Sequence, residues 1–247
     1  MKRSRGTLWL IVGLLAVSAL FYAIDYAVFR SARDMGFYTL LDLAFIPINV
    51  LIVGLFINGL IAAREREEML HKMNMVVGAF FSEVGRDLVE RLMAFDTDVD
   101  AVRPHMLFDA RWKPADYETH RAAVFGDQHP MAIARGDVDG LRDLLVDRRS
   151  FLLGLLQNGN LLEHQTFTDM LWAVSHLAEE LDARRDLHSL PAPDARHIEL
   201  DMARAYGRLL GESLLYARHL RADYPYLFSF AVRTNPFDPS ATVEVGE

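Results

Sequence analysis

The stretch FYTLLDLAFIPINVLIVGLFINGLIAA, residues 37–63, decides how the rest of this 247-residue chain is organised. Its 27 residues contain a single formal charge, on Asp42. An α-helix needs about 20 apolar residues to cross a hydrocarbon layer of about 30 Å, so this stretch is long enough to span a membrane with some tilt. The charged run REREE at residues 64–68 ends the span, but it contains no residue that ends a helix.

An amphipathic pattern continues beyond the charged run. Apolar residues recur there every three or four positions, which is the period of a helix. They are Met69, Met73, Val76, Phe80, Val84, Leu88, Leu92 and Phe95. We therefore predict one helix over residues 37–95, with Phe80 buried and with Gly78 and Gly85 placed where a second backbone can approach closely.

A second apolar run, residues 7–29, follows a basic N-terminus and is broken only by Asp25. A signal peptide cleaved after Ala19 is one interpretation of this run. The hydrophobicity continues ten residues beyond Ala19, which favours a membrane span. Gly13 and several alanines form a stripe of small residues along it, a pattern typical of helix–helix packing.

The short connection over residues 30–36 predicts a two-helix transmembrane hairpin, residues 1–63, with both of its ends on one side. Basic residues are more numerous on that side than in the connection, which carries Arg30 and Arg33. The positive-inside rule therefore predicts an inner-membrane protein with both termini in the cytoplasm. The basic residues on the side of the termini are Lys2, Arg3, Arg5, Arg64, Arg66 and Lys72.

The remainder of the chain shows helical patterns and no convincing strand, so the predicted fold class is all-α. The second span is expected to continue into a cytoplasmic helical domain, residues 64–233, followed by a disordered tail, residues 234–247. Thr166 is expected to cap one of the helices. The expected helices of the domain cover residues 115–124, 137–157, a segment from Thr166, a segment from the Pro191 break to about 221, and 224–232.

Charge and composition exclude several classes of function. Residues 1–63 carry a net charge of +2 and the remainder carries −10, which argues against nucleic-acid binding because phosphates require clustered Lys and Arg. The absence of cysteine excludes disulfides, thiolate metal sites and thiol nucleophiles. No phosphate-binding loop or hydrolase motif is present, and we expect no cofactor.

Two patterns could hold a metal ion. Asp96, Asp98 and Asp100 resemble the start of an EF-hand loop, but the glycine and the last glutamate are missing, so helix-end capping is the preferred interpretation. The weak candidates in the helical domain are His176 with Glu180, and Glu212 with His219, which lie beside Asp201. His176 lies about 160° from the centre of its helix's core face. We expect solvated faces and interhelical hydrogen bonds at these residues.

Polar residues within the apolar spans are candidates for function. Asp25 and Asp42 are expected at similar depth near the outer face, where an oligomer could form an acidic ring. Asn49 follows Asp42 by seven residues on the same face, whereas Asn58 lies roughly opposite. The preferred interpretation is that both carboxylates are interfacial and pair with Arg30, Arg33 or backbone donors.

Two segments carry a resemblance. Residues 74–85, NMVVGAFFSEVG, and residues 224–237, YPYLFSFAVRTNPF, are similar to segments of uncharacterised two-span prokaryotic membrane proteins with a cytoplasmic helical domain. The resemblance covers the soluble domain more than the spans. It implies the topology and no particular activity.

The sequence thus predicts a non-catalytic, homo-oligomeric inner-membrane protein in contact with the lipid bilayer, acting as a helical scaffold or a signalling module. A cation channel lined by Asp42 and Asn49 is the first alternative. A metal-dependent helical-bundle enzyme is the second. No feature identifies a protein partner.

Overall fold

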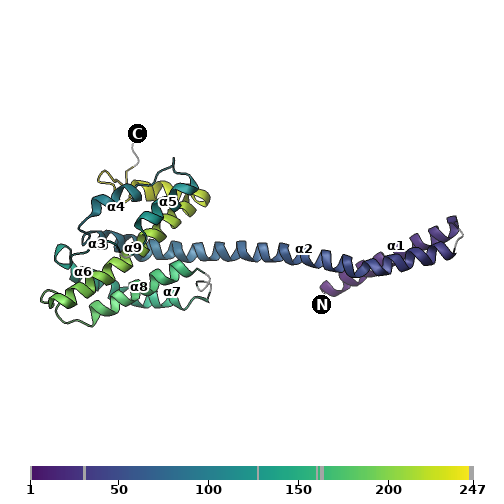
Figure 1. Cartoon of the computed structure of the whole chain (residues 1–247), viewed down its shortest axis with the longest axis horizontal. Helices are drawn as coiled ribbons and strands as arrows, with labels where there is room; N and C mark the ends of the chain where they lie inside the picture. Colours follow the sequence, from purple (N-terminus) through teal and green to yellow (C-terminus); the bar gives the residue numbers. More distant parts are fainter. Residues whose placement is uncertain (1, 30–31, 127, 160, 162–163, 245–247) are drawn as a thin grey trace. The chain divides into compact units, whose positions relative to one another are not determined.

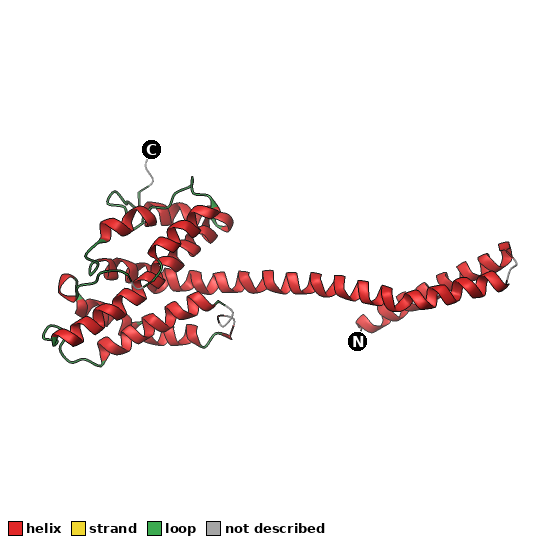
Figure 2. Ribbon diagram, viewed as in Figure 1, coloured by secondary structure: helices red, strands yellow, loops and turns green. Residues whose placement is uncertain are grey.

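The computed structural model of the chain describes residues 2–29, 32–126, 128–159, 161 and 164–244. Among these residues it contains helices and loops but no strand (Figure 2), which confirms the all-α class. The elements, drawn in Figure 1, are α1 (Lys2–Phe29), α2 (Ala32–Phe80), a π-helical turn η1 (Phe81–Gly85), α3 (Arg86–Met93), α4 (Val99–Met106), α5 (Pro114–Val124), a 3₁₀ turn η2 (Ile133–Arg135), α6 (Val138–Asp147), α7 (Arg149–Leu156), α8 (Gln165–Asp182), α9 (Ala192–Asp223) and α10 (Pro225–Arg233).

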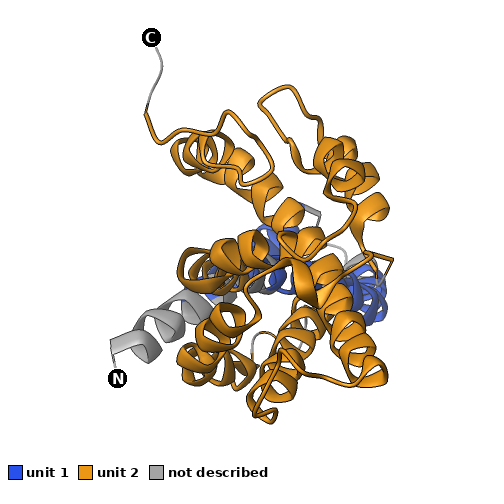
Figure 3. Cartoon of the chain, turned by 90° about the vertical axis from the view of Figure 1, so that its left-hand side faces the viewer, with its two compact units in different colours: residues 1–66 blue, residues 67–247 orange. Residues whose placement is uncertain are grey.

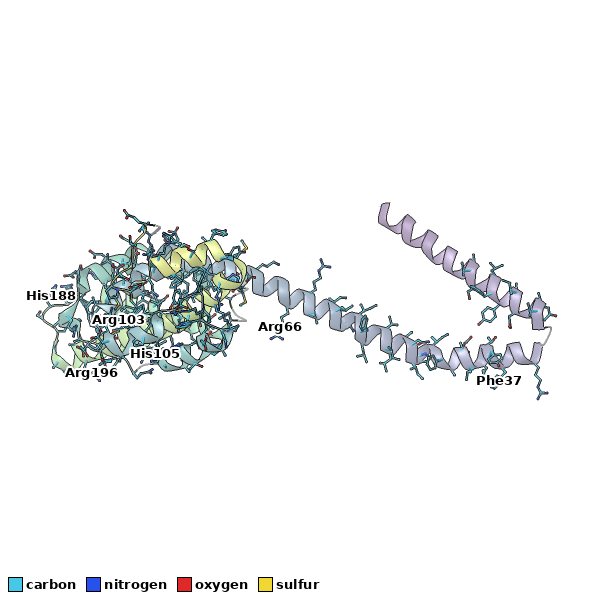
Figure 4. All side chains as sticks on the ribbon, turned by 90° about the horizontal axis from the view of Figure 1, so that it is seen from above. Phe37, Arg66, Arg103, His105, His188 and Arg196 are labelled. Atoms are coloured by element: carbon cyan, nitrogen blue, oxygen red, sulfur yellow. The ribbon has the colours of Figure 1, made fainter. Side chains whose placement is uncertain are left out.

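The chain divides into two compact units, Met1–Arg66 and Glu67–Glu247 (Figure 3). In the first unit, the segment Gly36–Arg64 of α2 is 29 residues long, has a mean hydropathy of 2.4 and buries none of its most apolar part. Its side chains project from the ribbon between the labels Phe37 and Arg66 in Figure 4. By length and composition, this segment can cross a membrane.

The first predicted span has less support. In α1 the apolar segment found among the described residues is Ala16–Val28, which is shorter than a span. Helix α2 begins at Ala32, so it includes most of the connection predicted over residues 30–36, and residues 30–31 lie outside the described part. One helix that can cross a membrane is therefore found, and the two-span hairpin stays a prediction.

The second unit is built around α9, which packs against α8, α5, α10 and α3. Most of its inward positions are apolar or small, including the fully buried Tyr206, Leu209 and Leu210. At Gly207 a Cβ atom would lie only 1.8 Å from the carbonyl oxygen of Gly126. Glycine is required there because the backbone of the connection after α5 lies against α9.

The predicted apolar stripe of the long helix is buried in this unit. Its core-facing members include Met73, Phe80, Val84, Leu88, Leu92 and Phe95. The prediction of one unbroken helix over residues 37–95 is wrong in two details, because a π-turn interrupts it at Phe81–Gly85 and α3 ends at Met93. A π-turn contains an extra residue, which allows both Phe80 and Phe81 to reach the core.

Other helix boundaries also differ from the prediction. The helix expected over residues 137–157 is two helices, because Arg148 leaves helical geometry with φ −94° and ψ 2°, and α6 and α7 each pack on α8. Helix α8 is capped by His164, whose Nδ1 accepts a hydrogen bond from Phe167 N at 3.2 Å, and not by Thr166. Asp96 closes the turn before α4 by accepting from Asp98 N at 2.9 Å.

The segment after α10 is docked onto the second unit. Thr234, Asn235 and Phe237 are buried. Asn235 Nδ2 donates to Met106 O at 2.7 Å, and Arg103 Nη1 donates to Phe237 O at 3.0 Å. The prediction of disorder from Thr234 onward is therefore wrong for residues 234–237, because their side chains satisfy backbone carbonyls and fill an apolar gap.

Candidate metal centre

Helices α8 and α9 each present a pair of side chains of the types that can ligate metals, one turn apart. His176 and Glu180 stand four residues apart on α8, and His197 and Asp201 have the same spacing on α9. Side chains at i and i+4 lie above one another on one face of a helix. Because α8 and α9 pack together, the two pairs meet in one cluster. Figure 4 labels Arg196, the neighbour of His197.

The carboxylate of Asp201 stands between the two imidazoles. Its Oδ2 lies 3.5 Å from His176 Nε2 and 3.4 Å from His197 Nε2. One ligand atom from each of these three residues lies within 4.8 Å of the other two. Zinc at about 2.0–2.1 Å from tetrahedral ligands separates those ligands by about 3.3 Å, so both His–Asp distances fit an ion bound between them.

Asp201 is the most deeply buried of the three candidate ligands. Its side chain is only 2% exposed, and its Oδ2 accepts no hydrogen bond from the described residues. Its other oxygen, Oδ1, is bound by Arg204 Nη1 at 2.5 Å. A buried acceptor without a hydrogen bond costs about 1–3 kcal/mol, and more when the group is charged. The two imidazoles lie at ion-pair distance from this oxygen and offset that cost only when they are protonated. A cation between the imidazoles and Oδ2 removes that cost.

Glu180 offers a fourth ligand. Its Oε1 lies 3.9 Å from His176 Nε2, and its Oε2 lies 3.5 Å from His197 Nε2. Arg184 Nη1 donates to Glu180 Oε2 at 2.6 Å, and this hydrogen bond lowers the pKa of Glu180, which keeps the carboxylate ionised. Arg184 also binds Asp194 through Nη2 at 2.6 Å, and that bond contributes most to the raised pKa of Arg184. Arg184 therefore holds the carboxylate of Glu180 in place, and Arg204 does the same for Asp201, as outer-shell partners do in metal sites.

Two imidazoles and one or two carboxylates select a class of ion. Imidazole suits zinc, copper, iron and nickel, whereas an all-oxygen ligand set suits magnesium and calcium. Two histidines with one carboxylate form the ligand set of several zinc and non-haem iron sites. The cluster therefore fits a divalent first-row transition ion.

The structure brings together only part of the set proposed from sequence. His176 and Glu180 belong to the cluster, but Glu212 is buried elsewhere on α9 and His219 pairs with Asp223 at 2.7 Å. Burial raises the pKa of Glu212. The sequence did not point to His197 as a ligand, although its spacing from Asp201 was the available signal. Which residues of α8 lie near His197 depends on how the two helices pack, and the spacing of residues along the sequence does not show that.

The other sequence-predicted residues lie outside this cluster. Asp42, Asn49 and Asn58 are exposed and Asp25 is half-buried, and the structure holds no second copy of the chain around them. The four packing candidates differ from one another. A Cβ at Gly13 would meet nothing within 4 Å, at Gly78 it would lie 3.4 Å from Tyr216 Oη, and at Gly85 it would lie 2.7 Å from Phe81 Cδ1, while Phe80 is fully buried.

Comparison with known proteins places the chain in a family. Residues 69–233 match the model described as uncharacterized protein MJ1433, C-terminal helical domain, and residues 2–61 match the MJ1433 N-terminal helical domain. The chain belongs to the MJ1433 family. It is 37% identical over 243 residues to uncharacterized protein MJ1433 of Methanocaldococcus jannaschii, covering 98% of both chains.

The family assignment confirms the coarser part of the sequence resemblance, which is a helical protein of uncharacterised type. The gap between the two MJ1433 family models, residues 62–68, contains the boundary between the two compact units at Arg66. The four residues of the cluster all lie in the region of the C-terminal helical domain. No solved structure matches the chain.

Proposed function

We propose that this protein is a membrane-anchored, non-catalytic module that binds one divalent transition ion between α8 and α9. The observation that carries the proposal is the buried Oδ2 of Asp201, which lacks a hydrogen bond and faces two imidazole nitrogens at 3.4 and 3.5 Å. In this proposal His176, His197 and Asp201 are the ligands. Glu180 or water completes the shell.

Bound metal acts here as a link between two helices. His176 comes from α8, whereas His197 and Asp201 come from α9. An ion that binds the folded chain and not the unfolded chain stabilises the fold by about 2.7 kcal/mol at a hundredfold excess over its dissociation constant. The junction of α8 and α9 would thereby respond to the concentration of the ion, which is what a sensing or regulatory module needs.

The exposure of the cluster supports a binding role over catalysis. The side chains of His176 and His197 are 47% and 50% exposed, so the site lies at the surface of the second unit. Enzyme sites are concave and mostly exclude water. The cavity of about 330 Å³ in this unit is lined by none of the four cluster residues.

The anchoring part of the proposal is supported by α2. The segment Gly36–Arg64 has a mean hydropathy of 2.4, and none of its most apolar part is buried. Such a surface is stable in a hydrocarbon layer and not in water. The excess of basic residues beside the termini supports a cytoplasmic position for the second unit and for both ends of the chain.

Titration of the metal-stripped, tag-free full chain in detergent with Zn²⁺ by calorimetry tests the binding site. We expect one ion per chain. Asp201→Asn keeps the shape of the side chain but removes its charge and should weaken binding about 10–100-fold or more, because it changes a direct ligand. His197→Ala should have at least the same effect.

The matched control is His188→Ala, which removes an exposed histidine that pairs with Asp139 outside the cluster. It should leave the zinc affinity unchanged. Thermal unfolding of each variant without metal shows whether the fold survives. Absence of zinc binding in the wild type, or equal affinity in Asp201→Asn, His197→Ala and wild type, would refute the metal centre and leave the cluster as a network of ion pairs.

A further inference from the structure

The second unit contains a cavity that the proposed metal centre does not use. Its volume is about 330 Å³, at the lower end of the range of about 300–1,000 Å³ that small-molecule sites occupy. Its walls come from η1, α3, α9, α10 and the docked segment after α10. It is therefore formed by parts of the chain that are far apart in sequence.

The lining of this cavity is mostly apolar and contains one charged residue. Phe81, Phe108, Leu220, Phe230 and Phe237 supply much of its surface, and Ser82, Ser213 and Asn235 supply polar atoms. Arg86 is the single charged residue among those that line it, and no Asp or Glu is present. An apolar chamber with one cation matches a ligand that has an apolar body and one negative charge.

Arg86 is available to such a ligand. Its guanidinium carbon lies 5.7 Å from the centre of the Phe230 ring, and no Asp or Glu stands among the residues that line the cavity. The residue is exposed, so its charge is accessible to solvent. A guanidinium binds carboxylate and phosphate groups through paired hydrogen bonds that are stronger than those between neutral groups.

The walls are held in place before any ligand arrives. The π-turn Phe81–Gly85 brings Phe81 and Ser82 to the cavity, and the Phe81 ring stacks on Tyr216 with centroids 5.0 Å apart and planes 6° apart. π-turns within helices occur frequently at functional sites. Asn235 fixes the opposite wall by donating to Met106 O at 2.7 Å and accepting from Phe237 N at 3.0 Å.

Tyr216 adds a neutral donor to this lining. Burial raises the pKa of its phenol, so the hydroxyl keeps its proton. No carboxylate stands among the lining residues to repel an anion. The polar residues of the lining therefore carry one positive charge and no negative charge.

We propose that this cavity binds a single-chain amphiphile with an anionic head group, with the apolar chain among the phenylalanines and the head on Arg86. This site is separate from the metal centre and adds a second ligand to the proposed function. Two head groups fit this description, a carboxylate, as in a free fatty acid, and a phosphate, as in a lipid, because both present oxygen pairs to the guanidinium.

Photolabelling of the full chain in lipid nanodiscs tests this proposal. The probe is dodecanoate with a diazirine at the end of its chain, and mass spectrometry maps the labelled residues. Competition by dodecanoate, dodecyl phosphate and dodecanol compares the head groups, and the stronger of the two anions identifies the natural class. We expect labels on the cavity lining, and dodecanol should compete at least about tenfold more weakly than either anion.

Three variants sharpen the test. Arg86→Gln removes the charge at an exposed position and should weaken dodecanoate binding about tenfold. Ala231→Trp fills the cavity and should abolish labelling. Arg185→Gln removes an exposed arginine outside the lining and should change nothing.

Equal competition by dodecanol, wild-type affinity in Arg86→Gln, or labels spread evenly over the chain would each overturn the proposal. If Ala231→Trp does not fold, the Arg86→Gln result decides, since Arg86 is exposed. Asp201→Asn should label like the wild type. Failure of the metal centre and failure of this cavity are therefore distinguishable.

Discussion

The two ends of helix α2 differ in apolar content and have opposite environments. In the segment Gly36–Arg64 the apolar side chains are exposed, and Phe56 is 68% exposed. At the other end Phe80 is fully buried in the second unit. The first segment is apolar over most of its surface, whereas beyond it the apolar residues recur at helical spacing and polar residues lie between them. The number of apolar residues and their distribution around the helix therefore together separate a surface that needs lipid from one that needs other helices.

Substituting one phenylalanine at each end of α2 should give the largest difference between the two ends. Phe80→Asp places an unpaired charge where the ring now packs edge-on against Phe167 at 5.6 Å. The unfolding free energy of the second unit should fall by at least about 3–5 kcal/mol. Phe56→Asp should leave the melting of that unit unchanged and cost about 2.5–3.5 kcal/mol of membrane insertion. Circular dichroism melting and membrane fractionation measure the two effects.

The comparison fails if both variants melt alike. Equal melting of Phe80→Asp and wild type would show that the buried stripe does not hold the second unit together. A lower melting temperature in Phe56→Asp would show that the exposed segment packs on protein.

Glycines give a second pair of tests, with a smaller effect. Gly207→Ala introduces a Cβ that would lie 1.8 Å from Gly126 O, a backbone atom, so the chain must move. We expect a loss of about 1–3 kcal/mol of stability in chemical denaturation, less than for Phe80→Asp. Gly54→Ala meets no atom within 4 Å and should leave the second unit unaffected. A neutral Gly207→Ala would contradict the close approach of the two backbones.

The smallest expected change in the unfolding free energy comes from the buried Asp96. Asp96 is fully buried, and desolvation raises its pKa above the usual range, although the nearby His129 acts in the opposite direction. The folded chain therefore holds this proton more tightly than the unfolded chain does. The unfolding free energy should fall as pH rises from about 3.9 through the folded-state pKa, and it should stay lower above that pH.

Asp96→Asn should remove that fall and raise stability at pH 7 by about 1 kcal/mol. The hydrogen bond from Asp98 N can be kept by the amide oxygen. Urea unfolding at several pH values measures the slope of the unfolding free energy against pH. Asp87→Asn, at an exposed aspartate, is the control that should retain it. If Asp96→Asn keeps the wild-type dependence of the unfolding free energy on pH, that dependence comes from other groups.

The sequence predicted the parts of this fold that depend on local patterns. The stripe through Phe80 and the short helix after Pro114 follow from periodicity and from proline at the first turn of a helix. The break at Arg148 could not be predicted, because α6 and α7 have continuous apolar spacing and the bend depends on their contacts with α8. The docked segment with Asn235 was also missed, since its partner, Met106 O, is a distant backbone atom.

The candidate metal centre shows the same limit. His176 could be named from its spacing to Glu180, and the helical wheel placed it away from the core face of α8. That position is also the one from which it reaches Asp201 on α9. A pattern on one helix gives the direction of a side chain relative to that helix, but the neighbour that it meets depends on packing across the unit.

Extraction of membranes that contain the full chain at high pH tests the difference between the two ends of α2 most directly. Alkaline carbonate releases peripheral proteins and leaves those whose helices lie in the hydrocarbon layer. The protein should stay in the membrane pellet, while Phe56→Asp should shift part of it to the supernatant. Complete release of the wild-type chain would contradict the assignment of Gly36–Arg64 to a membrane and would require another cover for its exposed apolar surface.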